Sequence, residues 1–271
     1  MKKVKKYVEY FITKMRVILK QKQYIYDNTA IKYMYENQRR KDLIIVFSSC
    51  TRKGIKARYN YVWTLKNMEL DQLFILDDYG GDGRGIFYLG KDMDFFAERA
   101  VIQLISHIMW KHHYRKIIFA GSSKGGYGAL NFGLLYPGSY IIAGAPQYHL
   151  GSYLMDPDNH LEDTLKYITG KSRESISKAA VKELDSHLYG KIQNYKSYKS
   201  SANIFLHYSR EERTYQEHIK DLIIDLKENG FYLQEDVGEY KNHSDVSLYF
   251  PGYLKTAIQL IIDSEECHEK G

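Results

Sequence analysis

The chain has 271 residues, of which 44% are apolar and 27% are charged. This is the composition of an ordinary folded protein, and it excludes disordered, collagen-like and low-complexity classes. No stretch reaches the roughly 18–20 consecutive apolar residues that a membrane span needs. The N-terminus lacks the apolar region and the cleavage site of a secretory signal. Because the two cysteines, Cys50 and Cys267, lack metal-ligand spacing, we expect no disulfide framework and a cytoplasmic location.

Charge is distributed unevenly along the chain, whose net charge is +6. Residues 1–24 contain eight basic side chains against a single acid, which gives this segment +7 and leaves the rest of the chain at −1. A nucleic-acid-binding domain is expected to be basic over a folded face. Nucleic acid is therefore not an expected partner.

Residues 1–28 are predicted to form a basic amphipathic helix that precedes a domain of residues 29–271. Apolar residues recur there at steps of three and four, namely Val4, Tyr7, Val8, Phe11, Met15, Ile18 and Leu19. Two interpretations stay open for this helix. It contacts an anionic membrane surface through residues 1–24, or it packs against the domain.

Downstream, short apolar runs typical of buried strands alternate with helical patterns. The predicted strands are 43–47, 72–76, 116–120, 140–143, 203–208 and 232–237. The predicted helices are 92–113, 124–136, 214–228 and 248–262. Strands buried on both faces and separated by helices indicate an α/β fold with a mainly parallel sheet and helices on both faces. The polar segment of about 147–200 interrupts this alternation and is predicted to be an inserted helical cap.

The motif G-x-S-x-G occurs as Gly121, Ser123 and Gly125, directly after a predicted strand and at the start of a predicted helix. This is the context of a nucleophile elbow, a sharp turn that presents the serine hydroxyl at the edge of the sheet. The adjacent helix N-terminus favours a developing oxyanion. Ser123 is therefore the predicted nucleophile, and Cys50, which has no elbow, is a poorer one.

A serine nucleophile needs a base and an acid that orients the base. His243 is the predicted base, because it lies in a loop between the last predicted strand and the last predicted helix. Glu212 is the favoured acid, since it follows the strand 203–208 by a few residues. Three other acids stay open: Glu211, Asp236 and Asp245.

Two backbone N–H groups are expected to form the oxyanion hole. One belongs to Lys124, and the second comes from the loop of Ser48, Ser49 and Cys50, with Ser49 preferred. The Lys124 side chain is expected either to bind an anionic substrate or to be exposed to solvent. The Asp77–Gly83 loop fails the EF-hand pattern. It is predicted to line the substrate site rather than to bind a metal, and no metal is expected.

The sequence G-S-S-K-G-G-Y-G-A-L, the segment Gly144–Gln147 and N-H-S-D resemble the α/β-hydrolase superfamily. Within it, they are similar to capsular-polysaccharide biosynthesis proteins of the XcbB/CpsF type and to the O-acetyltransferase of the accessory secretion system. The resemblance covers roughly residues 40–262. It implies the α/β-hydrolase fold and a Ser–acid–His triad that carries out acyl-ester chemistry on glycan hydroxyls.

The sequence therefore predicts a serine-dependent ester hydrolase or O-acyltransferase that needs no cofactor. Its expected partner is a small-molecule ester or an acylated glycan. The predicted substrate-binding residues are Ser48, Asp78, Tyr79 and Gln147. The alternative is a catalytically silent scaffold that binds a glycan or a partner enzyme. The oligomeric state is not predicted.

Overall fold

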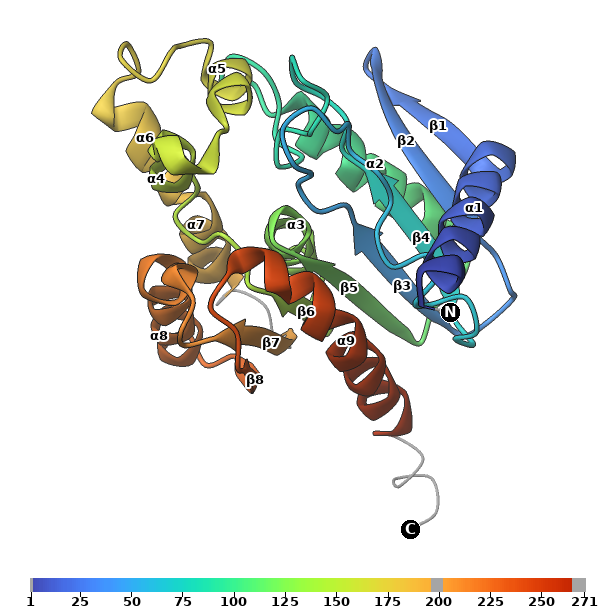
Figure 1. Ribbon diagram of the computed structural model, residues 1–271. Helices are drawn as coiled ribbons and strands as arrows, with labels where there is room; N and C mark the ends of the chain where they lie inside the picture. Colours follow the sequence, from blue (N-terminus) through green and yellow to red (C-terminus); the bar gives the residue numbers. More distant parts are fainter. Residues whose placement is uncertain (1, 196–201, 265–271) are drawn as a thin grey trace.

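The computed structural model describes residues 2–195 and 202–264, which form one eight-stranded sheet between two layers of helices (Figure 1). The strands are β1 (Gln21–Tyr26), β2 (Thr29–Glu36), β3 (Asp42–Phe47), β4 (Asp71–Leu76), β5 (Lys116–Ser122), β6 (Tyr140–Gly144), β7 (Asn203–Ser209) and β8 (Tyr232–Gly238). Their spatial order is β1-β2-β4-β3-β5-β6-β7-β8. β2 is antiparallel to both its neighbours, and every pair from β4 to β8 is parallel.

The central strands are buried on both faces, as their continuous apolar sequence predicts. In β3, Leu43, Ile45 and Phe47 point to one side of the sheet, while Ile44 and Val46 point to the other. Successive side chains of a strand alternate between the two faces, so each face needs its own layer of helices.

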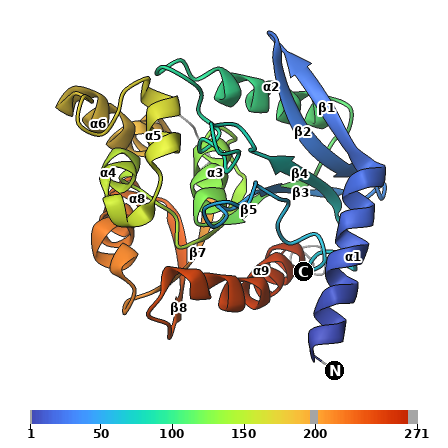
Figure 2. The ribbon, with the colours of Figure 1, turned by 45° about the horizontal axis from the view of Figure 1, so that its top comes forward.

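The helices divide between the two faces (Figure 2). α2 (Phe96–Trp110), α3 (Lys124–Gly133) and α8 (Lys220–Glu228) pack on the face of Phe47. α9 (Val246–Asp263) packs on the opposite face. The six predicted strands, from 43–47 to 232–237, correspond to β3–β8. The four predicted helices correspond to α2, α3, α8 and α9. The predicted fold class is confirmed.

The segment between β6 and β7 is helical and forms a cap at the upper left of Figure 1. Its helices are α4 (Leu150–Met155), α5 (Glu162–Thr169), α6 (Lys178–Asp185) and α7 (His187–Asn194). Glu98 in α2 fastens the cap to the sheet domain, because its buried carboxylate pairs with His187 at 3.3 Å and with Lys191. His187 and Lys191 hold the pKa of Glu98 at about 2 against the opposing effect of burial.

The N-terminal segment differs from its prediction. Helix α1 (Lys2–Lys20) ends eight residues before the predicted boundary, and residues 21–26 form the edge strand β1. Asp27 and Asn28, with φ of 45° and 58°, close a tight hairpin to β2. The prediction of a helix over residues 21–28 is therefore wrong. Among the described helices, none combines the length and the apolarity needed to cross a bilayer.

Candidate active site

Ser123 lies at a sharp turn between β5 and α3. Its backbone has φ 53° and ψ −126°, a conformation that a non-glycine residue adopts only when its surroundings enforce it. The Ser123 N–H donates to the Gly144 carbonyl at 2.7 Å, and its own carbonyl accepts from the Tyr127 N–H at 2.9 Å. These bonds hold the strained turn between two neighbouring elements.

The glycines of the G-x-S-x-G motif allow the turn to pack closely. A Cβ on Gly121 would lie 2.3 Å from the Gly125 carbonyl oxygen. A Cβ on Gly125 would lie 2.5 Å from the carbonyl oxygen of Phe47, at the end of β3. Both contacts are shorter than van der Waals distance, so a side chain at either position would displace the elbow.

The structure brings Ser123, His243 and Glu212 into hydrogen-bonding contact. His243 Nε2 lies 2.8 Å from Ser123 Oγ, and Nδ1 is hydrogen-bonded to the Glu212 carboxylate. Glu212 is 2% exposed, and an ionised carboxylate can only accept. Nδ1 therefore carries the hydrogen, which leaves Nε2 free to accept the Ser123 hydroxyl proton.

The other candidate acids have different partners. Glu211 is 55% exposed and lies 3.8 Å from Lys241. Asp236 is bonded to Nδ1 of His207 at 2.5 Å, and Asp245 accepts from Asn242 at 3.1 Å. Of the four acids considered, Glu212 is the one in contact with His243.

Gln147 also reaches the serine. It is fully buried, and its amide nitrogen donates to Ser123 Oγ at 3.3 Å and lies 3.3 Å from His243 Nε2. Gln147 follows β6, the strand whose Gly144 anchors the elbow. A side-chain donor in this position orients the Ser123 hydroxyl, so Gln147 contacts the predicted nucleophile directly.

The N–H groups predicted to form the oxyanion hole differ in whether they already have an acceptor. The Lys124 N–H is the first amide of α3 and has no acceptor among the described residues. The Ser49 N–H, however, donates to Oδ1 of Asn60 at 2.8 Å, and the Ser48 N–H donates to the Tyr88 hydroxyl. The Ser49 prediction is therefore wrong. The Cys50 N–H has no acceptor in the described part of the chain, and it is the remaining candidate from this loop.

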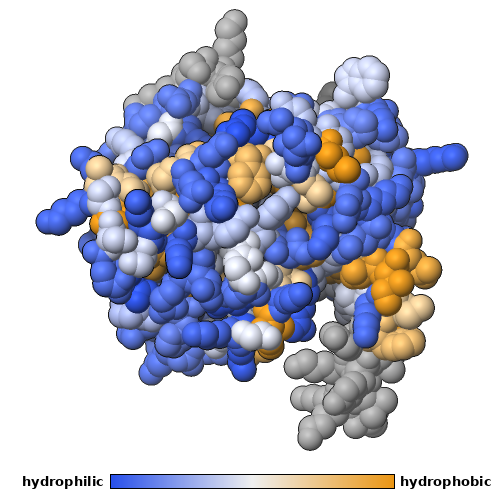
Figure 3. Space-filling view, turned by 90° about the horizontal axis from the view of Figure 1, so that it is seen from above, coloured by the Kyte–Doolittle hydropathy of each residue, from blue (hydrophilic) through white to orange (hydrophobic). Residues whose placement is uncertain are grey.

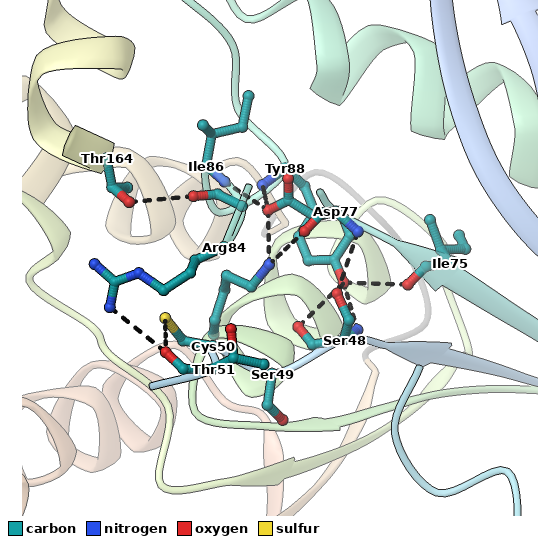
Figure 4. Close-up of polar contacts among 12 residues, drawn as sticks. Ser48, Ser49, Cys50, Thr51, Ile75, Asp77, Arg84, Ile86, Tyr88 and Thr164 are labelled. Carbon is teal, nitrogen blue, oxygen red and sulfur yellow. Dashed lines mark hydrogen bonds and ion pairs between the residues drawn. The ribbon is translucent and has the colours of Figure 1, made fainter. Parts of the chain in front are cut away.

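The Lys124 side chain neither meets solvent nor is free to bind substrate. It is fully buried, and Nζ lies 3.0 Å from Oδ2 of Asp77 and 3.1 Å from the Asp77 carbonyl oxygen. Both alternatives raised for this lysine are wrong. Figure 4 shows Asp77 at the centre of a polar cluster that also includes Ser48 and Tyr88.

Three of the predicted substrate-binding residues have structural contacts instead. Ser48 is 1% exposed, and its hydroxyl accepts from the Asp77 N–H at 3.2 Å. Asp78 pairs with Lys32 of β2 at 2.5 Å. The Tyr79 hydroxyl donates to the Ala30 carbonyl at 2.9 Å. Asp78 and Tyr79 therefore join the loop after β4 to the β1–β2 hairpin, and no contact between them and the triad is found within the described residues.

A cavity of about 310 Å³ lies between the cap and the segment that follows Glu212. Its lining residues are His149, Ser152, Tyr153, Asp156, Asn159, Glu217 and His218. Burial raises the pKa of Tyr153, a lining residue, so its hydroxyl stays protonated. The size is at the lower end of the range for ligand pockets.

One wall of this cavity is a single π-helical turn, Tyr215–Ile219. Such turns are rare and occur often at functional sites. His218 on this turn is buried, and its Nδ1 accepts from the His149 N–H at 3.2 Å. Burial and the neighbouring His149 lower the pKa of His218 to about 3, so it is neutral at physiological pH.

No protein-family model and no curated protein sequence matches the chain. Solved structures do match it. The capsule O-acetyltransferase of Neisseria meningitidis serogroup A aligns with a TM-score of 0.71 and 23% identity, over 88% of this chain and 94% of that chain. The glycosylation-associated protein (Gap123) complex of Streptococcus agalactiae aligns with a TM-score of 0.70 and 17% identity, over 90% of this chain and 47% of that chain.

The fluorophosphonate-binding serine hydrolase FphF of Staphylococcus aureus aligns with a TM-score of 0.62 and 15% identity, over 89% of this chain and 97% of that chain. At these identities the similarity establishes the architecture. The chain has the α/β-hydrolase fold, which it shares with serine hydrolases and with a capsule O-acetyltransferase.

Proposed function

We propose that the chain is a serine-dependent acyl-ester hydrolase or O-acyltransferase that works through an acyl-enzyme. The observation that supports this most strongly is the pair of hydrogen bonds that joins Ser123 to His243 and His243 to the buried Glu212. Few structural roles require a serine at a strained turn, a histidine and a buried carboxylate in this order. The arrangement corresponds to the Ser-His-acid triad of acyl-transfer enzymes.

The first half of the reaction transfers the acyl group to the protein. Ser123 Oγ attacks the ester carbonyl carbon while His243 Nε2 takes the hydroxyl proton. The charged carbonyl oxygen is stabilised by the N–H groups of Lys124 and Cys50, each of which contributes about 10²–10³-fold in rate in comparable sites. The C–O bond to the leaving group then breaks, and His243 returns the proton to that group. Glu212 stabilises the imidazolium in between.

The second half releases the acyl group. Water or an acceptor hydroxyl gives its proton to His243 Nε2 and attacks the acyl carbon, after which the Ser123 oxygen leaves and regains the proton. Hydrolysis and transfer differ only in the attacking hydroxyl. Transfer requires a cap that positions the acceptor and excludes water.

We further propose a glycan hydroxyl as the acceptor. The cavity beside Tyr153 supports this proposal, because its carboxylates, amide and hydroxyl groups suit a ligand that offers many hydroxyl donors. The shared fold with a capsule O-acetyltransferase is consistent with the same substrate class.

Turnover of an aryl acetate, measured with and without oligosaccharide acceptors, tests the proposal. Wild type should release the phenol, and an acceptor should be acetylated if the enzyme is a transferase. Ser123→Ala should reduce turnover at least about 10³-fold. Ser122→Ala, at the neighbouring buried serine, is the matched control and should retain activity. Turnover by wild type no faster than without protein would instead favour a silent scaffold, and equal turnover by wild type and Ser123→Ala would contradict the role of Ser123.

A further inference from the structure

In the second half of helix α1, four apolar side chains are exposed to solvent rather than packed against the domain. The exposed fractions are 64% for Phe11, 41% for Met15, 63% for Ile18 and 76% for Leu19. Steps of three and four residues place these four on one face of the helix, with Ile12 at its edge. Figure 3 shows apolar side chains gathered over α1 at the lower right of an otherwise mostly hydrophilic surface. An exposed apolar cluster of this kind marks an interaction site.

Contacts on the opposite face fix this orientation. Val17 packs against the core layer that also contains α9. Arg16 and Lys20 lie 3.6 and 3.3 Å from the carboxylate of Glu36, a buried residue of β2. The helix is therefore attached to the sheet through its polar side, and rotating the apolar face inward would break both ion pairs.

A basic cavity lies beside this helix. It has a volume of about 400 Å³ and is formed by α1 and the loop around residues 55–59. Lys14, Lys56 and Arg58 line it and are exposed. None of the three pairs with a carboxylate in the part of the chain that the structure describes. Lys14 is three residues from Phe11 and four from Ile18, so this cavity flanks the apolar face.

We propose that α1 and the cavity of Lys14, Lys56 and Arg58 form a binding site for the surface of an anionic lipid bilayer. The apolar face enters the boundary between headgroups and acyl chains, with the helix axis parallel to the membrane. The three cations contact lipid phosphates, as lysine and arginine side chains commonly do beside an apolar surface.

Charge argues for lipid over a second copy of the chain as the partner on this face. Residues 1–24 carry a net charge of +7. Pairing two α1 helices through their apolar faces would bring two such segments together, which is unfavourable at physiological ionic strength. An anionic bilayer offers apolar area and negative charge at once, so it satisfies both features of the surface.

Co-sedimentation of the full-length chain with vesicles tests this proposal. We expect binding to vesicles of phosphatidylcholine with phosphatidylglycerol, binding about tenfold weaker to phosphatidylcholine alone, and a decrease with added salt. The triple variant Phe11→Ser, Ile18→Ser and Leu19→Ser should lose binding to both vesicles. The variant Lys14→Gln, Lys56→Gln and Arg58→Gln should lose mainly the preference for phosphatidylglycerol.

Matched controls change equivalent residues elsewhere on the surface. Ile224→Ser with Leu260→Ser removes exposed apolar side chains, and Lys178→Gln, Lys182→Gln and Lys220→Gln removes three exposed positive charges; both should bind as wild type does. Absence of vesicle binding, or equal binding by the α1 variants, would overturn the proposal. A wild-type dimer in light scattering that the serine variant converts to a monomer would assign the face to a second copy instead.

Discussion

The ammonium group of Lys124 lies 3.0 Å from Oδ2 of Asp77, and neither side chain is exposed to solvent by more than 2%. Lys124 directly follows Ser123, while Asp77 follows β4. The same Asp77 oxygen accepts from the N–H groups of Ile86 and Tyr88, at 2.8 and 3.0 Å. The Tyr88 hydroxyl in turn accepts from the Ser48 N–H. The buried ion pair therefore connects the elbow to the loop that carries the Cys50 amide.

Removing one partner of this pair should be costly. Lys124→Met keeps the approximate volume and leaves the Asp77 carboxylate buried without a cation. Breaking a buried ion pair in this way costs about 3–5 kcal/mol. Unfolding in urea measures the loss. The double variant Lys124→Met with Asp77→Asn removes both charges and should recover part of it, whereas single variants as stable as wild type would contradict the assigned role of the pair.

Two glycine-to-alanine substitutions should have opposite effects. Gly125→Ala places a Cβ 2.5 Å from the Phe47 carbonyl oxygen and should destabilise the fold and disturb the elbow. Gly190→Ala, in α7, has no atom within 4 Å of the added carbon and should stabilise the chain by about 0.5–1 kcal/mol. Thermal unfolding of both variants checks this. A Gly125→Ala variant of wild-type stability would show that the elbow is less tightly packed.

Replacing Glu212 by glutamine should lower kcat strongly, whereas the same change at Glu211 should not. Glu212→Gln keeps the shape but can donate to His243, which favours the wrong tautomer, so kcat for an aryl acetate should fall by about 10⁴-fold. Glu212→Asp should retain more activity than Glu212→Gln. Glu211→Gln changes an exposed side chain and should leave kcat within about twofold of wild type. The reverse result would make Glu211 the acid.

His218 should contribute to the pH dependence of stability. Its pKa is about 3 in the folded chain and near 6.5 when unfolded, so the unfolded chain binds the extra proton between these values. Its contribution to stability is therefore complete above about pH 6.5 and decreases as the pH falls toward 3. His218→Asn retains an acceptor for the His149 N–H but does not titrate. Urea midpoints at about pH 7 and about pH 5 should differ less for this variant than for wild type. Equal differences would contradict the depressed pKa.

The fold was predictable because the central strands are continuous apolar runs separated by helical patterns. The elbow was recognisable because its glycines stand directly after such a strand. The β1–β2 hairpin was missed because five of the six residues of β1 are exposed, so its sequence shows no alternation. Residues 21–28 therefore resembled a continuation of the preceding helix.

The hydrogen bonding of the loop after β3, which carries Ser49 and Cys50, could not be predicted from sequence. Whether Ser49 or Cys50 has a free N–H depends on Asn60, eleven residues after Ser49, because the Asn60 side chain accepts the hydrogen bond of the Ser49 N–H. The burial of Lys124 depends likewise on Asp77, and neither partner is adjacent in sequence. The one available signal was the position of Asp77, a carboxylate directly after a fully buried strand, where a buried partner is expected.

The central claim is that Ser123 is a nucleophile activated by His243. Its most direct test is reaction of the wild-type chain with a fluorophosphonate, followed by digestion and mass spectrometry of the peptides. A single adduct on Ser123, absent after heat denaturation and greatly reduced in His243→Ala, is the predicted result. An unmodified Ser123, or an adduct on another residue at equal rate in wild type and Ser123→Ala, would contradict it.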